Sequence, residues 1–216
     1  MKRIARSTLQ TAVSLVFFAV IGTAILASVF FMTHDAIVKS EEAEKMKLIT
    51  QIVPPALFDN DIIQDKLTIP ASELLGTEDI TTAYRARLNG EPSAVVLESV
   101  APDGYSGKIS LILAVRANGE LAGVRVVAHR ETPGLGEYIE LPKIPWIKGF
   151  DGKSREVYKD ADWKVKKDGG QFEYMAGATI TPRAIVKAVN KALIYFGENR
   201  DKLFVANEPI PKKEKK

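Results

Sequence analysis

The sequence predicts an α+β protein in which a single N-terminal transmembrane helix precedes one mixed α/β domain with antiparallel hairpins. Residues 7–33 contain no charged side chain and no histidine, and they are dense in Val, Leu, Ile, Phe and Ala. Two pairs of apolar, strand-like segments follow, each joined by an Asn-Gly turn, at Asn89-Gly90 and at Asn118-Gly119. An amphipathic helical pattern over residues 182–198 completes the domain.

The apolar segment is long enough to cross a bilayer. At about 1.5 Å per residue, residues 7–33 would span roughly 40 Å as a helix. A secretory signal peptide has a shorter apolar region of roughly 7–15 residues and ends at a small-residue cleavage site. Ala24, Ala27 and Ser28 could imitate such a site, so cleavage is an alternative, but the length favours one uncleaved transmembrane helix.

Charges beside this segment predict its orientation. Lys2, Arg3 and Arg6 precede it closely, whereas the lysines that follow are farther away and mixed with acidic residues. The positive-inside rule therefore favours a cytoplasmic N-terminus and a domain on the opposite, periplasmic side.

The remaining elements follow in chain order. Residues 35–53 predict a helix that continues out of the membrane and is stopped by Pro54-Pro55. Residues 57–76 have weak periodicity and stay mostly unassigned. Strands are predicted at 81–88, 93–100, 108–117 and 120–128, with shorter strand candidates at 162–166 and 171–174.

The chain therefore divides into four expected parts. Residues 1–34 form a cytoplasmic N-terminus and an anchor, and residues 35–80 form a connecting helical and irregular segment. Residues 81–205 form the globular domain. Residues 206–216 are rich in Lys and predict a disordered basic tail.

Composition excludes several classes of function. The chain has no Cys, which excludes disulfides, thiolate nucleophiles and iron–sulfur ligation. Its two histidines, His34 and His129, stand far apart and offer no paired metal-ligand spacing, so no metal site is expected. The net charge of +3 is too small to argue for nucleic acid, and no nucleotide-binding glycine motif is present.

The first segment that carries chemistry is Ala176-Gly177-Ala178-Thr179-Ile180-Thr181-Pro182, which leads into the last helix. Thr181 fits the N-cap of that helix, and Pro182 fits its first position. Thr179 then lies just before a helix N-terminus, where unpaired N–H groups and the helix dipole favour a phosphate. Ordinary turn and capping chemistry explains the same residues, and by physics alone it is the stronger explanation.

The second segment is His129-Arg130-Glu131-Thr132-Pro133-Gly134-Leu135-Gly136, directly after the second hairpin. A proline and two glycines restrict the backbone of this loop, and four polar side chains stand at its start. Loops of this kind on rigid strands often bind ligands. The alternative is a surface turn in which Arg130 and Glu131 form a solvated charge pair.

The segments HRETPGLGE and AGATITPRAIVKAV, in this order behind an N-terminal span, resemble the G subunit of the Rnf (also called Rsx) electron transport complex. They resemble the C subunit of the sodium-pumping NADH:quinone oxidoreductase more distantly, and both belong to the FMN-binding domain family. The resemblance covers roughly residues 1–200. The family pattern S/T-G-A-T-x-T begins here with Ala176, a departure at a position that is not the acceptor. The chain is short for the quinone-reducing enzyme's subunit, which favours the Rnf family.

The resemblance implies that Thr179 carries FMN as a phosphoester, installed outside the cytoplasm by a flavin transferase that uses FAD and Mg²⁺. It implies a bacterial inner-membrane complex, with multi-span partner subunits, that couples electron flow between reduced ferredoxin and NAD⁺ to Na⁺ or H⁺ movement. This chain would relay electrons, with no catalytic residue and no turnover of its own. The expected cofactor contacts are Gly177, Ala178, Ile180 and Thr181 around the phosphate, and Glu131, Thr132, Gly134, Leu135 and His129 toward the flavin ring. Trp146 and Tyr174 are aromatic candidates, with a core role favoured for Trp146.

Three rival functions remain. A non-redox, membrane-anchored binding module would carry no flavin. A membrane regulator with the same domain would usually have further spans or cysteines. A hydrolase lacks a visible triad, because Ser106 in Gly-Tyr-Ser-Gly does not form a nucleophile elbow.

Overall fold

The computed structural model describes residues 2–205, and the predicted tail at residues 206–216 lies outside them. The chain divides into two compact units between Lys45 and Met46. Helix α1 (Lys2–Ile52) is continuous through both units, which confirms the helix predicted to continue as far as Pro54-Pro55.

The first unit is the apolar part of α1. The helical stretch that starts at Leu9 is long and apolar enough to cross a membrane, and its most apolar part is not buried against the rest of the protein. The hydroxyls of Ser14, Ser28 and Thr33 donate to carbonyls four residues earlier, at 3.0, 2.8 and 2.8 Å. These bonds satisfy polar groups that hydrocarbon could not.

The second unit contains a five-stranded antiparallel sheet in the order β1-β2-β3-β4-β5. The strands are β1 (Lys66–Ile69), β2 (Thr81–Leu88), β3 (Glu91–Gly104), β4 (Gly107–Arg116) and β5 (Leu121–Ala128). Asn89 and Gly90 both have positive φ, 54° and 80°, as a two-residue hairpin turn requires. At the other predicted turn only Gly119 does, with φ 90°.

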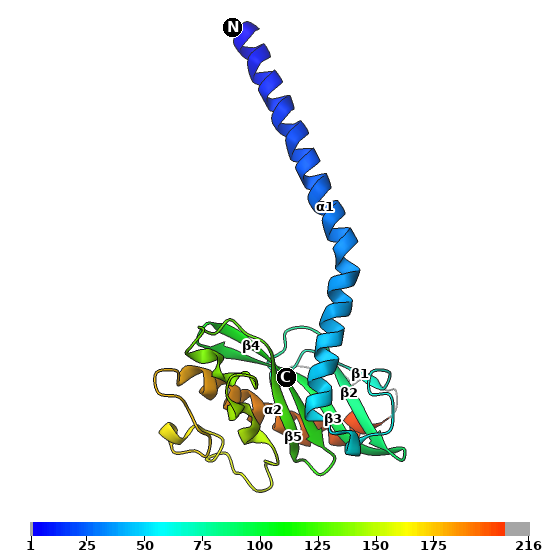
Figure 1. Ribbon diagram of the computed structural model, residues 1–216, viewed down its shortest axis with the longest axis vertical. Helices are drawn as coiled ribbons and strands as arrows, with labels where there is room; N and C mark the ends of the chain where they lie inside the picture. The colour runs from blue at the N-terminus through cyan, green and yellow to red at the C-terminus, as the bar shows by residue number, and fades with distance from the viewer. Residues whose placement is uncertain (1, 206–216) are drawn as a thin grey trace, which may run out of the picture. The chain divides into compact units, whose positions relative to one another are not determined.

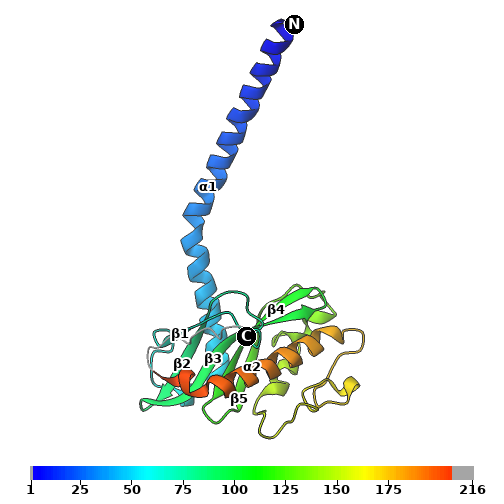
Figure 2. The ribbon, with the colours of Figure 1, turned by 180° about the vertical axis from the view of Figure 1, so that it is seen from behind.

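Both faces of the sheet are covered. On one face α2 (Ile180–Phe204) buries Ile185 and Val189 against a core that includes Val95 and Leu97 of β3 (Figure 2). On the other face the last turns of α1 bury Ile49 and Ile52 in a second core with the alternate β3 residues, Ala94 and Val96 (Figure 1). Two buried faces explain why β3 and β4 are apolar at consecutive positions.

The C-terminal end of α2 is attached to the sheet through two arginines of β2. Arg87 donates to the Phe204 carbonyl at 2.9 Å, and Arg85 donates to the Val205 carbonyl. Arg85 is almost fully buried and pairs with Asp65, whose carboxylate also accepts from Arg87. These bonds satisfy carbonyls that the end of a helix would otherwise leave without partners.

The segment between β5 and α2 differs from the prediction. It contains three short 3₁₀ helices: η2 (Gly136–Ile139), η3 (Pro145–Phe150) and η4 (Lys166–Asp168). Another short 3₁₀ helix, η1 (Pro55–Leu57), lies outside this segment and directly follows α1. The two predicted short strands make one isolated parallel bridge, Val165↔Phe172, and form no strand. Aromatic packing holds the segment together, with Phe172 stacked on Phe150 at 4.7 Å between centroids. The added strand, β1, lies in the stretch that the sequence left mostly unassigned.

Candidate cofactor pocket

A cavity of about 310 Å³ lies where three segments of the second unit meet: the β3–β4 turn, the loop after β5 and the start of α2. It brings together the two segments that the sequence singled out, although about 40 residues separate them in the chain. Its lining residues are Tyr105, Glu131, Thr132, Leu135, Gly136, Gly177, Ala178, Thr179, Ile180 and Thr181. Of the expected contacts, Gly134 and His129 are not in this lining.

Thr179 occupies the N-cap of α2, so the expected cap at Thr181 is wrong. The helix begins at Ile180, which makes Thr181 its second residue and Pro182 its third. A turn closed by the Ala178 N–H and the Met175 carbonyl at 3.1 Å, with Gly177 at φ 88°, delivers the chain into the helix earlier than the Pro signal indicated. Thr179 is half-buried and makes no side-chain capping hydrogen bond.

The first turn of α2 directs backbone donors toward this site. In an α-helix the N–H groups of the first residues have no acceptor within the helix. Here these are the N–H groups of Ile180 and Thr181, because Pro182 has none and the Arg183 N–H bonds the Thr179 carbonyl at 3.4 Å. Together with the positive end of the helix dipole they favour an anion beside Thr179.

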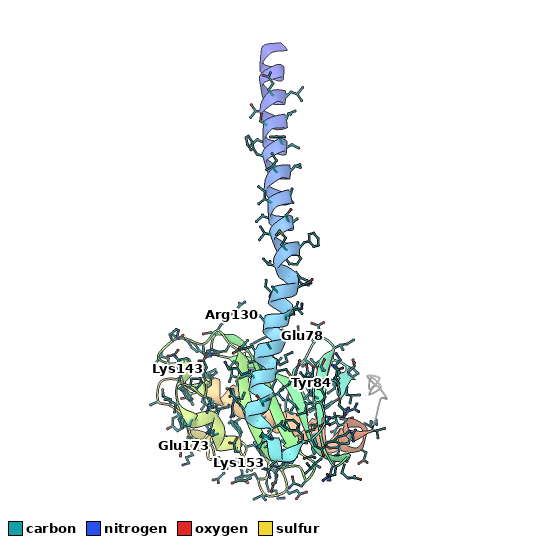
Figure 3. The ribbon with its side chains drawn as sticks, turned by 45° about the vertical axis from the view of Figure 1, so that its right-hand side comes forward. Glu78, Tyr84, Arg130, Lys143, Lys153 and Glu173 are labelled. Atoms are coloured by element: carbon teal, nitrogen blue, oxygen red, sulfur yellow. The ribbon has the colours of Figure 1, made fainter. Side chains whose placement is uncertain are left out.

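Glu131 joins the three walls of the pocket. Its Oε2 accepts a hydrogen bond from the Thr181 hydroxyl at 2.6 Å, and its Oε1 accepts from the Ser106 N–H at 3.0 Å. The side chain is 5% exposed. The alternative of a solvated Arg130–Glu131 pair is therefore wrong: Arg130 is exposed on the surface, where Figure 3 labels it, and Glu131 is buried.

The Thr132–Gly136 loop owes its path to its glycines. The N–H groups of Leu135 and Gly136 both donate to the Thr132 carbonyl, at 3.1 and 3.0 Å, and Gly134 has φ 77°. A Cβ on Gly136 would lie 2.6 Å from Oε2 of Glu131, so only glycine leaves room for the buried carboxylate. Gly136 was not among the expected lining residues, although it is the last glycine of the segment.

The Gly134 N–H donates to Glu137 Oε1 at 2.9 Å. This bond is the main reason why the pKa of Glu137 is lowered, and Lys143 adds to it. Lys143 lies on the surface (Figure 3), 3.4 Å from the Glu137 carboxylate. The ionised Glu137 therefore holds the turn from outside the pocket.

His129 stabilises the loop through hydrogen bonds of both its ring nitrogens. Its Nδ1 accepts from the Glu131 N–H at 3.0 Å, so Nε2 carries the proton and donates to Glu140 at 2.7 Å. His129 lines a separate hollow with Ser106, Gly107, Lys108, Ser110, Ala128 and Arg130. His129, an expected cofactor contact, thus bonds the backbone of Glu131 and lies outside the lining of the main cavity.

The aromatic candidates also lie outside the lining. Trp146 is half-buried, packs edge-on against Tyr138 at 5.7 Å, and donates its indole N–H to the Glu173 carbonyl at 2.7 Å. Tyr174 is 38% exposed. Tyr138 contacts the Ala178 carbonyl at 3.4 Å, and burial raises its pKa to about 12. It thus ties the η2 segment to the backbone just before Thr179.

The aromatic residue that does line the pocket is Tyr105, which was not among the expected contacts. It stands in Gly104-Tyr105-Ser106-Gly107, a stretch considered only for a hydrolase serine. The only sequence signal for Tyr105 is its place between two glycines at a hairpin tip. The hydrophobic periodicity that identifies strands and helices does not detect such a signal.

Comparisons with known proteins agree with this geometry. A model of the FMN-binding domain matches residues 104–194, which contain all three walls of the pocket, and a model of the RnfG N-terminal region matches residues 1–52. The chain is 48% identical to the G subunit of the ion-translocating oxidoreductase complex of Pseudomonas aeruginosa, over 94% of this chain and 95% of that protein.

Two further relatives carry the same name. The protein from Shewanella loihica is 45% identical over 92% of this chain and 93% of its own length. The protein from Vibrio cholerae is 41% identical over 90% of this chain and 91% of its own length. In all three comparisons the aligned region covers at least 90% of this chain. The chain therefore belongs to the family of G subunits of ion-translocating oxidoreductase complexes.

Proposed function

We propose that this chain is the electron-relay subunit of a membrane-bound, ion-translocating ferredoxin:NAD⁺ oxidoreductase complex, and that it carries FMN bonded through its phosphate to the Thr179 hydroxyl. The position of Thr179 is the main support. It lines the cavity at the start of α2, and its hydroxyl makes no capping hydrogen bond. The match to the FMN-binding domain supports the choice of cofactor.

The residues around Thr179 fit a phosphate group. The N–H groups of Ile180 and Thr181 would donate to its oxygens, and the helix dipole would stabilise its negative charge. A Cβ at Gly177 would meet no atom within 4 Å, so the approach beside Thr179 is open. A flavin transferase would form the bond during maturation, with the Thr179 oxygen replacing AMP on FAD.

The rest of the pocket fits the flavin ring, with Thr132 and Leu135 in its lining and Glu131 as a fixed negative charge beside it. Bound FMN supplies the transfer of single electrons. The chain's own residues hold the ring and set its potential through burial, hydrogen bonds and charge. In this proposal the chain has no catalytic residue, and it turns over only within the complex.

The anchor supports a place in the bacterial inner membrane. Lys2, Arg3 and Arg6 favour a cytoplasmic N-terminus, which puts the domain and Thr179 on the periplasmic side. The multi-span subunits of the complex would be the partners there. The side chains of residues 9–33 include no ionisable group that could mark an ion path, so ion movement would belong to those subunits.

A denaturing gel viewed under ultraviolet light tests the proposal. The full chain is co-expressed with a flavin transferase as wild type, as Thr179→Ala and as Thr68→Ala. Thr68 is the matched control because it is an exposed threonine of β1 outside the pocket lining. We expect fluorescent bands for the wild type and Thr68→Ala and a dark band for Thr179→Ala.

Two outcomes would contradict the proposal. A fluorescent Thr179→Ala band would move the attachment to another residue. A dark wild-type band, with the transferase shown to be active on a second substrate protein, would favour a non-redox binding module. If the wild-type band is fluorescent, the partners that co-purify with the tagged chain distinguish the Rnf complex from the sodium-pumping NADH:quinone oxidoreductase.

A further inference from the structure

We propose that Tyr105 is the aromatic contact of the flavin ring in this pocket. The inference rests on the proposed function, because it needs the ring to be there. It assigns a role to a residue that lies 74 positions before Thr179 and in neither sequence segment that pointed to the cofactor.

Tyr105 has a fixed backbone position. It lies at the tip of the β3–β4 hairpin, where Gly104 and Gly107 face each other in register. A Cβ on Gly104 would lie 2.3 Å from the Gly107 carbonyl oxygen, and Gly107 has φ 114°. Both glycines are needed for a turn this tight, and the tight turn projects the tyrosine from the end of the sheet.

The same carboxylate that supports the helix start holds this turn. Glu131 accepts from the Ser106 N–H, next to Tyr105, and from the Thr181 hydroxyl, close to Thr179. One buried side chain therefore links the turn that carries Tyr105 to the helix start that carries Thr179. A site arranged in this way is formed before its ligand binds, which lowers the entropy cost of binding.

The exposure of Tyr105 is what a ligand would explain. Its side chain is 68% exposed although it lines the cavity. Leu135 and Ile180, also in the lining, are 48% and 46% exposed. An aromatic and two aliphatic side chains thus stand uncovered around one cavity. A flat tricyclic ring would bury all three, and ligand pockets are typically lined in this way.

The contact predicts a measurable optical property. A phenol in contact with a photoexcited flavin gives it one electron and takes the electron back, so light emission is suppressed without net chemistry. Indole does the same, whereas the benzene ring of phenylalanine is too hard to oxidise. Flavin fluorescence should therefore be weak in the folded protein and recover when the protein unfolds.

The test uses the full chain, loaded by co-expression with the flavin transferase. The denaturing gel measures flavin content, and native fluorescence is divided by that content. We expect Tyr105→Ala and Tyr105→Phe to raise native fluorescence per flavin toward the unfolded value, and Tyr105→Trp to keep it low. The matched control, Tyr174→Ala, removes a tyrosine outside the pocket lining and should leave the ratio unchanged.

Each outcome has one meaning. A wild-type band without flavin, with the transferase shown to be active on a second substrate protein, removes the proposed function and this inference with it. A loaded wild type whose fluorescence per flavin equals that of Tyr105→Ala overturns the inference alone. A rise in Tyr174→Ala as large as that in Tyr105→Ala also overturns it, because the contact would then not be specific to the turn.

Discussion

The Thr181 hydroxyl donates a 2.6 Å hydrogen bond to Oε2 of Glu131, a residue 50 positions earlier in the chain. The bond joins the first turn of α2 to the loop after β5, and both groups are buried. It explains why Thr181 does not cap the helix: its hydroxyl is engaged with the carboxylate. Thr179, two residues before it, is left at the cap and lines the cavity.

We expect Thr181→Val to destabilise the domain by about 1–3 kcal/mol, because a buried carboxylate loses one of its two donors while side-chain volume is preserved. Urea unfolding of the full chain in detergent, followed by tryptophan fluorescence, measures the change. Thr181→Ser keeps the hydroxyl and serves as the control. Equal midpoints for the valine and serine variants would show that the bond contributes nothing to stability.

Gly136→Ala should also displace Glu131. The added Cβ would lie 2.6 Å from its Oε2 and 2.7 Å from its Cβ, and the glycine cannot retreat without breaking the turn. We expect a loss of about 1–3 kcal/mol in the same unfolding assay. Gly149→Ala, whose Cβ would meet no atom within 4 Å, should change stability little. A Gly136→Ala protein as stable as Gly149→Ala would contradict this packing.

Glu131→Gln tests the charge of the pocket. A buried negative charge beside the flavin opposes the addition of an electron, so the uncharged amide should raise the flavin potential by on the order of tens of millivolts. A redox titration of the loaded protein, read by flavin absorbance, measures the shift. Glu173→Gln, at an exposed carboxylate away from the lining (Figure 3), should leave the potential unchanged. A potential that is insensitive to Glu131→Gln would place the ring away from the carboxylate.

Alkaline pH should lower the free energy of unfolding of the domain, because the buried phenol of Tyr138 ionises. Burial raises the pKa of its phenol from 10.0 to about 12, so the folded chain holds the proton more tightly than the unfolded chain. Its contribution to stability is present below pH 10 and is lost as the pH rises through about 12. Tyr138→Phe should flatten this loss in unfolding midpoints measured across that range. Burial also raises the pKa of Tyr195, so Tyr195→Phe should independently flatten part of the same loss.

The hairpins could be predicted because their signals are local. Strand β2 has the bounds expected from its apolar pattern, and the Asn89-Gly90 turn has the positive φ values that these residue types tolerate. At Asn118-Gly119 the turn is longer. The Gly119 N–H bonds the Arg116 carbonyl and only the glycine is left-handed, a difference that a dipeptide signal does not specify.

The elements that were missed depend on tertiary contacts. Strand β1 is four residues long, too short for its alternation to stand out, and it exists because β2 offers it a partner edge. The short strands expected near Val165 and Phe172 give way to ring packing around Phe172. In the pocket, the motif segments were visible in the sequence, but Tyr105 became part of the site only when the sheet brought its turn beside them.

The bond between Thr181 and Glu131 also means that the pocket depends on contacts between distant parts of the chain. The two contacts that join the pocket walls connect residues 25 and 50 positions apart, so no short stretch of unfolded chain presents Thr179 in this setting. Under the proposed attachment, a flavin that contacts all three walls of the pocket therefore requires the folded domain.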